Sequence, residues 1–449
     1  MLGDYFRWFI LCLATACLTS VFSNMVTINF TIVCMDPGKN SNSTNPANPL
    51  HFYSQTEKTM IQWTVSIASM IATFPFSYAC TKIGAQYVFL TTGILSAFAT
   101  AVIPPAIEWG FYWLLAARVV QGIAYACDFA VVGVICSRWA SLRENAKFLA
   151  LLTCFAPLSN SLTNIVAGYI CDSSWGWPWV HYSHAILGMF LFTLWAIFYT
   201  DDPQNNKFVS KKELSIIHMD KSEAHKNHSG YIPYKAICKD KVVWAVWVNA
   251  FADLFSGFFL FIYAPTYTKK VLGFSTTETG IVGALGSLSH IPVKLVCGYF
   301  SDTCKCLPER KKMWFFNSVA VLTPAAIYVY LCFAPASMPM LAAILFGGVH
   351  AALGFNCGGF YKCGSLVSRQ YAEFVIAFTQ FIKCSVFFIA PALVAIFVHD
   401  ETNATQWHAI FYLTAGILVL ANIFFCFQAT DKPASFTEIT GPEHKKADF

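Results

Sequence analysis

The sequence predicts an all-α membrane protein with about twelve transmembrane helices in two six-helix bundles. Separate stretches of about 20 apolar residues run from Phe6 to Phe427 and contain few charged side chains. Of the 449 residues, 56% are hydrophobic and only 12% are charged, whereas soluble domains carry about 25% charged residues. A soluble fold would leave too little interior for 42 phenylalanines.

The third observation is the longest polar stretch, Asp201 to Lys241, which is rich in Lys, His, Asn and Ser and divides the apolar stretches six and six. We therefore expect an N-terminal bundle at 1–200, a cytoplasmic linker at 201–241, a C-terminal bundle at 242–428 and a polar, disordered cytoplasmic tail at 429–449. The expected spans are 8–34, 58–81, 86–106, 110–138, 148–171, 179–200, 242–265, 277–300, 313–334, 339–360, 372–398 and 408–428.

The distribution of basic residues predicts the orientation. With a cytoplasmic N-terminus, 22 of the 29 Lys and Arg residues fall on the inner side, four outside and three within spans. The glycosylation sequons at Asn42 and Asn403 then face the outer or lumenal side, whereas the sequon at Asn227 is cytoplasmic and should stay unmodified. The sequence leaves open whether the membrane is the plasma membrane or a lysosomal or vesicular one.

Several classes of function lack support in the sequence. The basic residues lie in short loops and form no patch interleaved with aromatic residues, so we expect no nucleic-acid partner. No metal-ligand spacing, nucleophile with a base, or Gly-rich phosphate loop occurs, so we expect neither an enzyme nor a bound cofactor. Most of the 17 cysteines fall inside apolar stretches, where free thiols act as small hydrophobic groups, and they imply no disulfide framework.

Charged side chains inside the spans are the candidate functional residues, because burying an ion in hydrocarbon costs several kcal/mol unless it meets a partner or water. His290 and Lys294 share one helix face, and three cations against two carboxylates favour a small anionic solute. The expected substrate-binding residues are Arg118, Lys294, Lys383, His290 and Asn356. The residues expected to bind a coupling proton or sodium ion are Asp128, Asp253 and His350.

Each of these residues could instead have a purely structural role. Arg118 could pair with Asp128, and Asp253 with Lys383, so that the charges hold helices together and touch no ligand. A buried neutral histidine needs only one hydrogen bond, and Asn356 could bond a neighbouring helix. At the level of the whole protein, the alternative is a receptor or scaffold that does not transport; a channel is disfavoured because no rings of charge line one pore.

Two short motifs resemble those of the major facilitator superfamily. Arg118 followed by Gln121 and Gly122 resembles the superfamily's fourth-helix pattern. Gly298 and Asp302, followed by the basic run from Arg310, resemble its loop motif between helices eight and nine. The resemblance implies a solute transporter that works by alternating access, with Gly298, Asp302 and Arg310 acting as a conformational switch.

Within that superfamily the chain is most similar to the anion and cation symporters, which include sodium/phosphate cotransporters, sialin and vesicular glutamate transporters. The similarity runs from Arg7 to about Gln428 and rests on the order of several weak motifs. These are Asp202-Pro203, Pro233 to Ile237, Ala264 to Tyr267, Gly354 to Asn356, and Trp407 followed by Phe411.

The chain also departs from that family. Where the glutamate carriers have arginines in helices one and seven, it has Ser23 to Met25 and, near the second, Asp253. Their fourth-helix glutamate falls at Tyr125 and their eighth-helix histidine near Ser287. The resemblance therefore implies a diverged branch with a rebuilt binding site, and we do not expect glutamate as substrate.

Overall fold

The computed structural model describes residues 5–35, 51–141, 145–218, 232–304, 306–334 and 338–439. Helices and turns make up these residues, which confirms the predicted all-α class. The first half of the chain contains α1 (Phe6–Met35), α2 (Gln55–Lys82), α3 (Ala85–Trp109), α4 (Phe111–Tyr125), α5 (Asp128–Trp139), α6 (Asn145–Leu152), α7 (Phe155–Asp172) and α8 (Pro178–Phe198).

Short helices η2 (Pro203–Asn205), α9 (Lys211–Ile217) and α11 (Tyr234–Ile237) lie between the two halves in sequence. The second half contains α12 (Lys241–Lys270), α13 (Thr276–Thr303), α14 (Glu309–Leu331), α15 (Pro339–Leu353), η3 (Gly354–Gly358), α16 (Phe360–Ser368), η4 (Arg369–Tyr371), α17 (Ala372–Phe397), α18 (Ala404–Gln428) and η5 (Ser435–Glu438).

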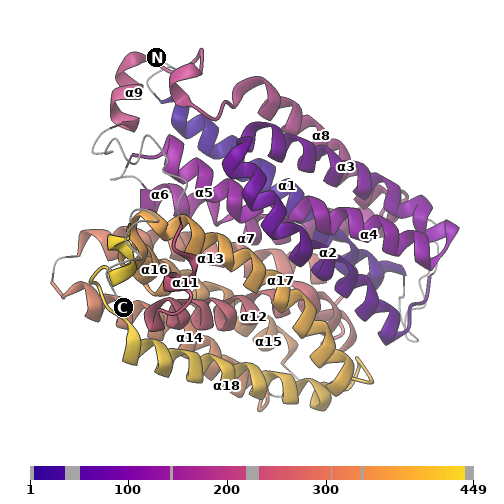
Figure 1. Ribbon diagram of the computed structural model, residues 1–449. Helices are drawn as coiled ribbons and strands as arrows, with labels where there is room; N and C mark the ends of the chain where they lie inside the picture. The colour runs from indigo at the N-terminus through magenta and orange to yellow at the C-terminus, as the bar shows by residue number, and fades with distance from the viewer. Residues whose placement is uncertain are drawn as a thin grey trace.

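The long helices of each half form a separate group, and the two groups lie side by side (Figure 1). Both ends of the chain lie at one end of the molecule, which we call the termini end. The opposite end carries a disulfide and is called the disulfide end below. Capping boxes start two helices at the disulfide end: Ser54 with Glu57 caps α2, and Ser275 with Glu278 caps α13.

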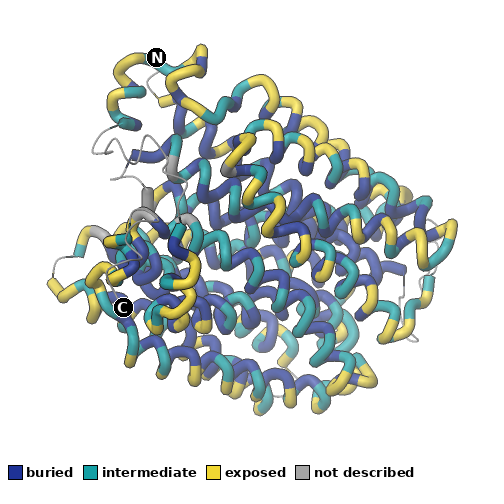
Figure 2. Tube along the Cα trace, in the orientation of Figure 1, coloured by how far each residue is buried: buried dark blue, intermediate teal, exposed yellow. Residues whose placement is uncertain are grey.

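Eleven helical segments of the described chain are long and apolar enough to cross a membrane. The 28-residue helix α2 is equally long but more polar, and it packs against α4 and α17. Large apolar side chains such as Phe98, Phe190 and Leu420 are more than half exposed, while the buried residues gather in the interior of the molecule (Figure 2). Outward apolar faces of this kind suit contact with lipid, as expected of an integral membrane protein.

Three spans that the sequence predicts as continuous are interrupted. The fourth breaks between α4 and α5, the fifth between α6 and α7, and the tenth at η3 between α15 and α16. At the last break Gly354 packs directly on α13: a Cβ at this position would lie 2.9 Å from the His290 carbonyl oxygen and 3.0 Å from the Lys294 nitrogen. The absence of a side chain thus allows the chain to approach α13 closely.

The linker and the start of the tail are more ordered than the sequence predicts. The buried carboxylate of Glu213 in α9 accepts hydrogen bonds from the backbone nitrogens of Phe6 and Arg7 at 3.0 and 2.9 Å, and it pairs with the Arg7 guanidinium. In the tail, Phe436 is buried, so the expectation of disorder is wrong for residues 429–439. Buried apolar residues such as Ile217 and Phe436 are isolated among polar neighbours, so the sequence pattern does not predict this packing.

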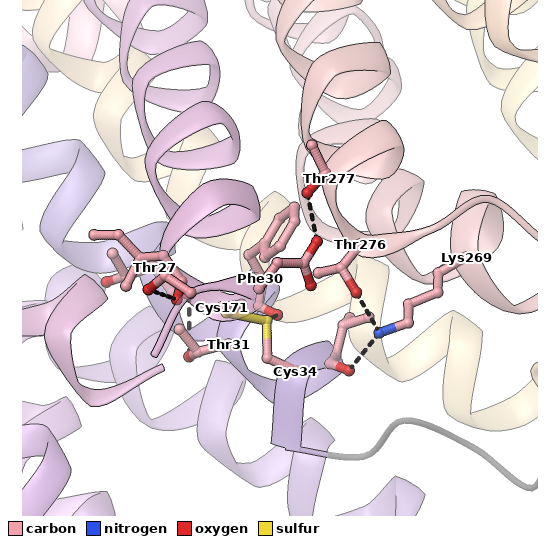
Figure 3. Close-up of a disulfide and its surroundings, with 12 residues drawn as sticks. Thr27, Phe30, Thr31, Cys34, Cys171, Lys269, Thr276 and Thr277 are labelled. Carbon is pink, nitrogen blue, oxygen red and sulfur yellow. Dashed lines mark hydrogen bonds between the residues drawn. A yellow bond between two sulfur atoms is a disulfide. The ribbon is translucent and has the colours of Figure 1, made fainter. Parts of the chain in front are cut away.

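A disulfide joins Cys34 at the end of α1 to Cys171 at the end of α7 (Figure 3). This corrects the expectation that the cysteines form no disulfide, although none of the other 15 is disulfide-bonded in the described residues. The two residues are 137 positions apart, and both follow apolar runs in which a free thiol would be equally stable. Sequence spacing therefore could not distinguish this pair from the rest.

Candidate functional site

A cavity of about 60 Å³ lies between the two halves, which is room for a few water molecules. The first half lines it with residues of α5 and of the junction between α6 and α7, and the second half with α12, α13, α15, η3, α16 and α17. Six of the eight residues predicted to bind substrate or coupling ion line it: Asp253, His290, Lys294, His350, Asn356 and Lys383. The other two, Arg118 and Asp128, are not in its lining.

Asp253 of α12 is fixed by Asn356 from the break at η3. The Asn356 amide nitrogen donates to both carboxylate oxygens, at 3.0 and 3.3 Å. The bond follows from the interruption of the tenth span, which carries Asn356. Among the described residues the Asn356 side-chain oxygen is buried and has no hydrogen-bond partner. An unpartnered acceptor beside a cavity is available to a ligand or to water.

The two histidines and Lys294 also line the cavity. His290 bonds the His350 carbonyl oxygen through Nδ1 at 2.9 Å, and the His350 ring stacks on Phe261 with centroids 5.0 Å apart. The Lys294 ammonium lies 5.8 Å from the centre of the Tyr361 ring. Within the described part of the chain, Lys294 makes no ion pair shorter than 4.0 Å, although the residue is 3% exposed.

Lys383 pairs with Asp128, not with Asp253 as one alternative supposed. Its ammonium nitrogen lies 4.0 Å from a carboxylate oxygen of Asp128, the first residue of α5. Lys383 comes from the second half and Asp128 from the first, so the pair crosses between the halves. Position along a helix predicts the depth of both residues but not which carboxylate the lysine reaches.

Arg118 makes its hydrogen bonds within the first half of the chain. Its guanidinium donates to the carbonyl oxygen of Met25 at 2.9 Å, of Ile61 at 3.4 Å and to the side-chain oxygen of Gln121 at 2.6 Å. Gln121 in turn donates to Thr100. Arg118 therefore joins α4 to α1 and α2 through neutral acceptors, and among the described residues it makes no ion pair with Asp128, the partner that the alternative supposed. Because it is also absent from the cavity lining, it is not part of the candidate site.

Removing Arg118 changes the charge balance of the cavity. The predicted count of three cations against two carboxylates becomes Lys294 and Lys383 against Asp128 and Asp253. With neutral histidines, the buried groups then sum to zero. The expected excess of positive charge is therefore not present in this arrangement.

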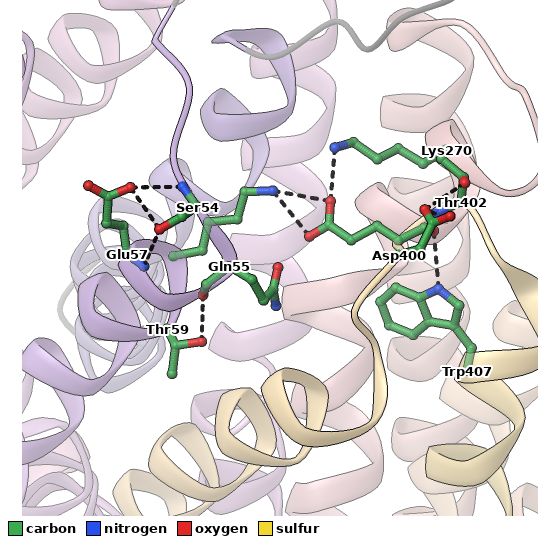
Figure 4. Close-up of polar contacts among 10 residues, drawn as sticks. Ser54, Gln55, Glu57, Thr59, Lys270, Asp400, Thr402 and Trp407 are labelled. Atoms are coloured by element: carbon green, nitrogen blue, oxygen red, sulfur yellow. Dashed lines mark hydrogen bonds and ion pairs between the residues drawn. The ribbon is translucent and has the colours of Figure 1, made fainter.

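The disulfide end joins the halves through a shared carboxylate (Figure 4). Glu401, between α17 and α18, pairs with Lys58 of α2 at 3.1 Å and with Lys270 of α12 at 2.8 Å. All three side chains are less than one-fifth exposed. We call these three residues the Glu401 clamp; sequence reasoning missed it because each residue lies in a polar loop or at a helix end.

Two further contacts cross between the halves beside the disulfide (Figure 3). Lys269 donates to the Val33 carbonyl oxygen at 3.3 Å, and Thr277 donates to the Asp172 carboxylate. Val33 and Asp172 are the chain neighbours of the bonded cysteines. The disulfide therefore holds together the two helix ends that the second half contacts.

The expected switch residues lie at the termini end of α13 and α14. Gly298 faces Cys357, whose sulfur would lie 3.8 Å from an added Cβ, and Arg310 lies over the Trp314 ring at 4.8 Å. The Asp302 side chain lies outside the described part of the chain. Its proposed role as a switch stays a prediction.

A network beside these residues was not predicted. Glu309 of α14 pairs with Lys362 of α16 at 3.1 Å and also with Lys312. Both lysines donate to the Ser301 carbonyl oxygen of α13, at 2.9 and 3.0 Å. The network ties three helices of the second half together, and its signal in the sequence is only a basic run after a loop.

The two predicted glycosylation sites differ in what the structure describes. Asn403 is exposed at the start of α18, where its side chain accepts a hydrogen bond from the Thr405 nitrogen at 3.0 Å. Asn42 lies outside the described residues. Glycosylation of both stays a prediction.

The comparison with protein families agrees with this architecture. A family model described as Major Facilitator Superfamily matches residues 9–391. Sodium-dependent phosphate transport protein 1 of Rattus norvegicus is 26% identical over 440 residues, covering 94% of this chain and 92% of that protein. A probable small intestine urate exporter of Mus musculus is 26% identical, covering 84% and 77%, and sialin of Homo sapiens is 25% identical, covering 79% and 72%.

Solved structures share the fold. A D-xylose–proton symporter aligns with a TM-score of 0.68 and 12% identity, covering 95% of this chain and 98% of that one. A bacterial homolog of the human lysosomal transporter Spinster, in an inward-facing and occupied conformation, aligns with a TM-score of 0.65 and 13% identity, covering 94% and 96%. The predicted two-bundle fold and the predicted similarity to anion and cation symporters are thereby confirmed.

Proposed function

This chain belongs to the major facilitator superfamily of membrane transporters, and from that membership we propose that it is a secondary active transporter of a small anionic solute. The solute would bind in the cavity between the halves, together with a coupling proton or sodium ion. Lys294, His290 and the free oxygen of Asn356 would contact the solute, and Asp253 would take up the coupling cation.

One observation carries the proposal: the buried charges in and beside the cavity balance, because Lys294 and Lys383 face Asp253 in the lining and Asp128, the partner of Lys383, just outside it. An anion that entered alone would leave a net negative charge in a low-dielectric site, which is costly. If a proton or sodium ion neutralises Asp253 at the same time, Lys294 is left as the free cation for the anion. Charge balance therefore favours coupled binding of an anion and a cation, which is symport.

The contacts between the halves support alternating access. The Glu401 clamp, Lys269 with Val33 and Thr277 with Asp172 all tie the halves at the disulfide end. Transport would require these contacts to open while the termini end closes. The Gly298, Asp302 and Arg310 motif would act at the termini end in that change.

We further propose that the termini end is cytoplasmic. Its loops carry most of the Lys and Arg residues, and the opposite end carries the disulfide, which is stable in an extracellular or lumenal compartment. The known relatives include sialin and a sodium-dependent phosphate transport protein. Their names support an anion for this chain, in the plasma membrane or in a lysosomal or vesicular one.

Purified protein in proteoliposomes tests the proposal. We expect uptake of at least one of labelled phosphate, urate and sialic acid, driven by either an inward proton gradient or an inward sodium gradient, and no accumulation without a gradient. Lys432, which is exposed after α18, offers a matched control because Lys432→Gln should transport normally. Uptake of an organic cation, or no uptake of any of these anions under either gradient, would contradict the proposal.

A further inference from the structure

Lys383 enters an aromatic cage that the other half of the protein provides. Its ammonium nitrogen lies 4.2, 4.6, 5.0 and 5.8 Å from four ring centres. In that order the rings, which we call the aromatic cage, are Tyr125, Phe129, Phe155 and Phe22. They come from α4, α5, α7 and α1 of the first half, whereas Lys383 comes from α17 of the second half.

The cage holds the ammonium without a hydrogen bond. The Lys383 and Asp128 side chains are 1% and 0% exposed. Neither the Lys383 nitrogen nor the two Asp128 oxygens have a hydrogen-bond partner among the described residues. The ammonium is thus desolvated and is stabilised by ring faces and by one carboxylate 4.0 Å away. Ring faces with a carboxylate are the groups that recognise organic ammonium ions.

We propose that the aromatic cage and Asp128 form a binding site for a primary ammonium ion, and that Lys383 is its built-in occupant. In this role Lys383 is a positioning residue: it neutralises Asp128 and links the two halves at mid-depth. The assignment departs from the expectation that Lys383 binds the transported anion, and it leaves Lys294 as the solute's cation. Only this last consequence rests on the proposed function.

A lysine-to-alanine variant provides the probe. Truncation at Lys383→Ala removes three carbons and the ammonium, so the missing group corresponds to n-propylammonium. In the purified full chain we expect n-propylammonium to raise the Tm of Lys383→Ala saturably, by about 3 °C. No saturable Tm shift is expected in the wild type or in Lys294→Ala, because Lys383 still fills the cage in both. None is expected in the double variant Lys383→Ala with Asp128→Asn, because its cage lacks the carboxylate.

A second measurement covers the case in which Lys383→Ala does not purify. In a double-mutant cycle, Lys383→Met and Asp128→Asn should each lower Tm, and the double variant should be more stable than either single variant, because it removes both charges. Additive losses would overturn the proposed pairing. If n-propylammonium does not raise the Tm of Lys383→Ala, the cage is not a binding site for this ion. An equal rise in the Tm of Lys294→Ala would likewise show that the ion binds elsewhere.

Neither measurement depends on transport. A chain that binds n-propylammonium in the emptied cage but carries no anion would contradict the proposed function and leave this inference standing. A chain that transports an anion but shows additive Tm losses would do the reverse.

Discussion

At the scale of single residues, Lys294 is the cavity cation that is free to meet a solute. The carboxylate in the cavity lining, Asp253, is already bonded to Asn356, and Lys383 pairs with Asp128. Lys294 instead lies beside the Tyr361 ring. The anion should therefore depend on Lys294 more than on any other buried charge.

Lys294→Gln should weaken binding of the transported anion. Loss of one charge-assisted hydrogen bond costs about 1.5 to 3 kcal/mol, which corresponds to a rise of about tenfold to hundredfold in apparent KM. Initial rates of anion uptake against concentration measure this, with the exposed Lys432→Gln as control. Lys383→Gln is measured in parallel. An equal rise in KM for this variant would mean that Lys383 also contacts the solute. Wild-type KM values for both variants would contradict the proposal that buried lysines bind an anion.

Asp253→Asn should separate coupling from movement. The amide imitates the neutral carboxylic acid and cannot take up a proton or sodium ion, so uphill accumulation should be lost while exchange of solute across the membrane continues. Counterflow and gradient-driven uptake in the same vesicles distinguish the two. The exposed Asp431→Asn serves as control. Accumulation that survives Asp253→Asn would make this residue structural and move attention to Asp128.

At the scale of elements, the interrupted helices decide where the site lies. The breaks fall beside Asp128, beside Phe155 and at Asn356, which are all at or next to the cavity. Six long helices contain proline and still run unbroken; the prolines inside them are Pro75, Pro104, Pro105, Pro265, Pro292, Pro324 and Pro391. Proline is thus no guide to the breaks in this chain.

The sequence predicted the existence and order of the spans because apolar runs of this length have few other uses. It could not predict the breaks, since Ala126, Cys127 and Gly354 lie within equally apolar runs. It placed six of eight candidate residues at the cavity because depth along a helix follows from counting residues. It could not predict that Arg118 bonds within the first half or that Lys383 reaches Asp128, because rotation about the helix axis and side-chain reach depend on tertiary packing.

The Glu401 clamp is an element-scale contact that links α2, α12 and the segment before α18. Burial raises the pKa of the Glu401 carboxyl, but Lys58 and Lys270 outweigh burial, so its pKa lies below its ordinary value of 4.5. A carboxylate with a depressed folded-state pKa contributes stability above its unfolded pKa, and this contribution is lost as pH falls through the folded-state pKa.

Glu401→Gln should therefore lower the free energy of unfolding by about 1 to 2 kcal/mol at neutral pH. The gap between wild type and variant should stay constant from neutral pH down to about pH 5 and shrink only below the ordinary pKa. Thermal unfolding at a series of pH values measures it, with the exposed Glu438→Gln as control. A gap that widens on acidification would contradict the clamp.

At the scale of the whole molecule, two independent signals support the proposed cytoplasmic position of the termini end. Basic residues predominate in the loops of the termini end, and a disulfide lies at the opposite end. The first signal reflects how membrane insertion reads positive charge, and the second reflects the redox state of the compartment. Their agreement is informative, because neither was used to find the other.

This orientation predicts which sequons receive glycans. Asn42 and Asn403 should be modified and Asn227 should not, because only the outer or lumenal side meets the glycosylation machinery. Single-sequon variants expressed in eukaryotic cells, with gel mobility compared before and after glycosidase treatment, measure this. Thiol labelling with and without reductant provides the matching test of Cys34 and Cys171, for which the exposed Cys238, outside the spans, is the control. A glycan on Asn227 would reverse the assignment of the two ends, and free thiols at both cysteines in the protein isolated from cells would remove the support that the disulfide gives to it.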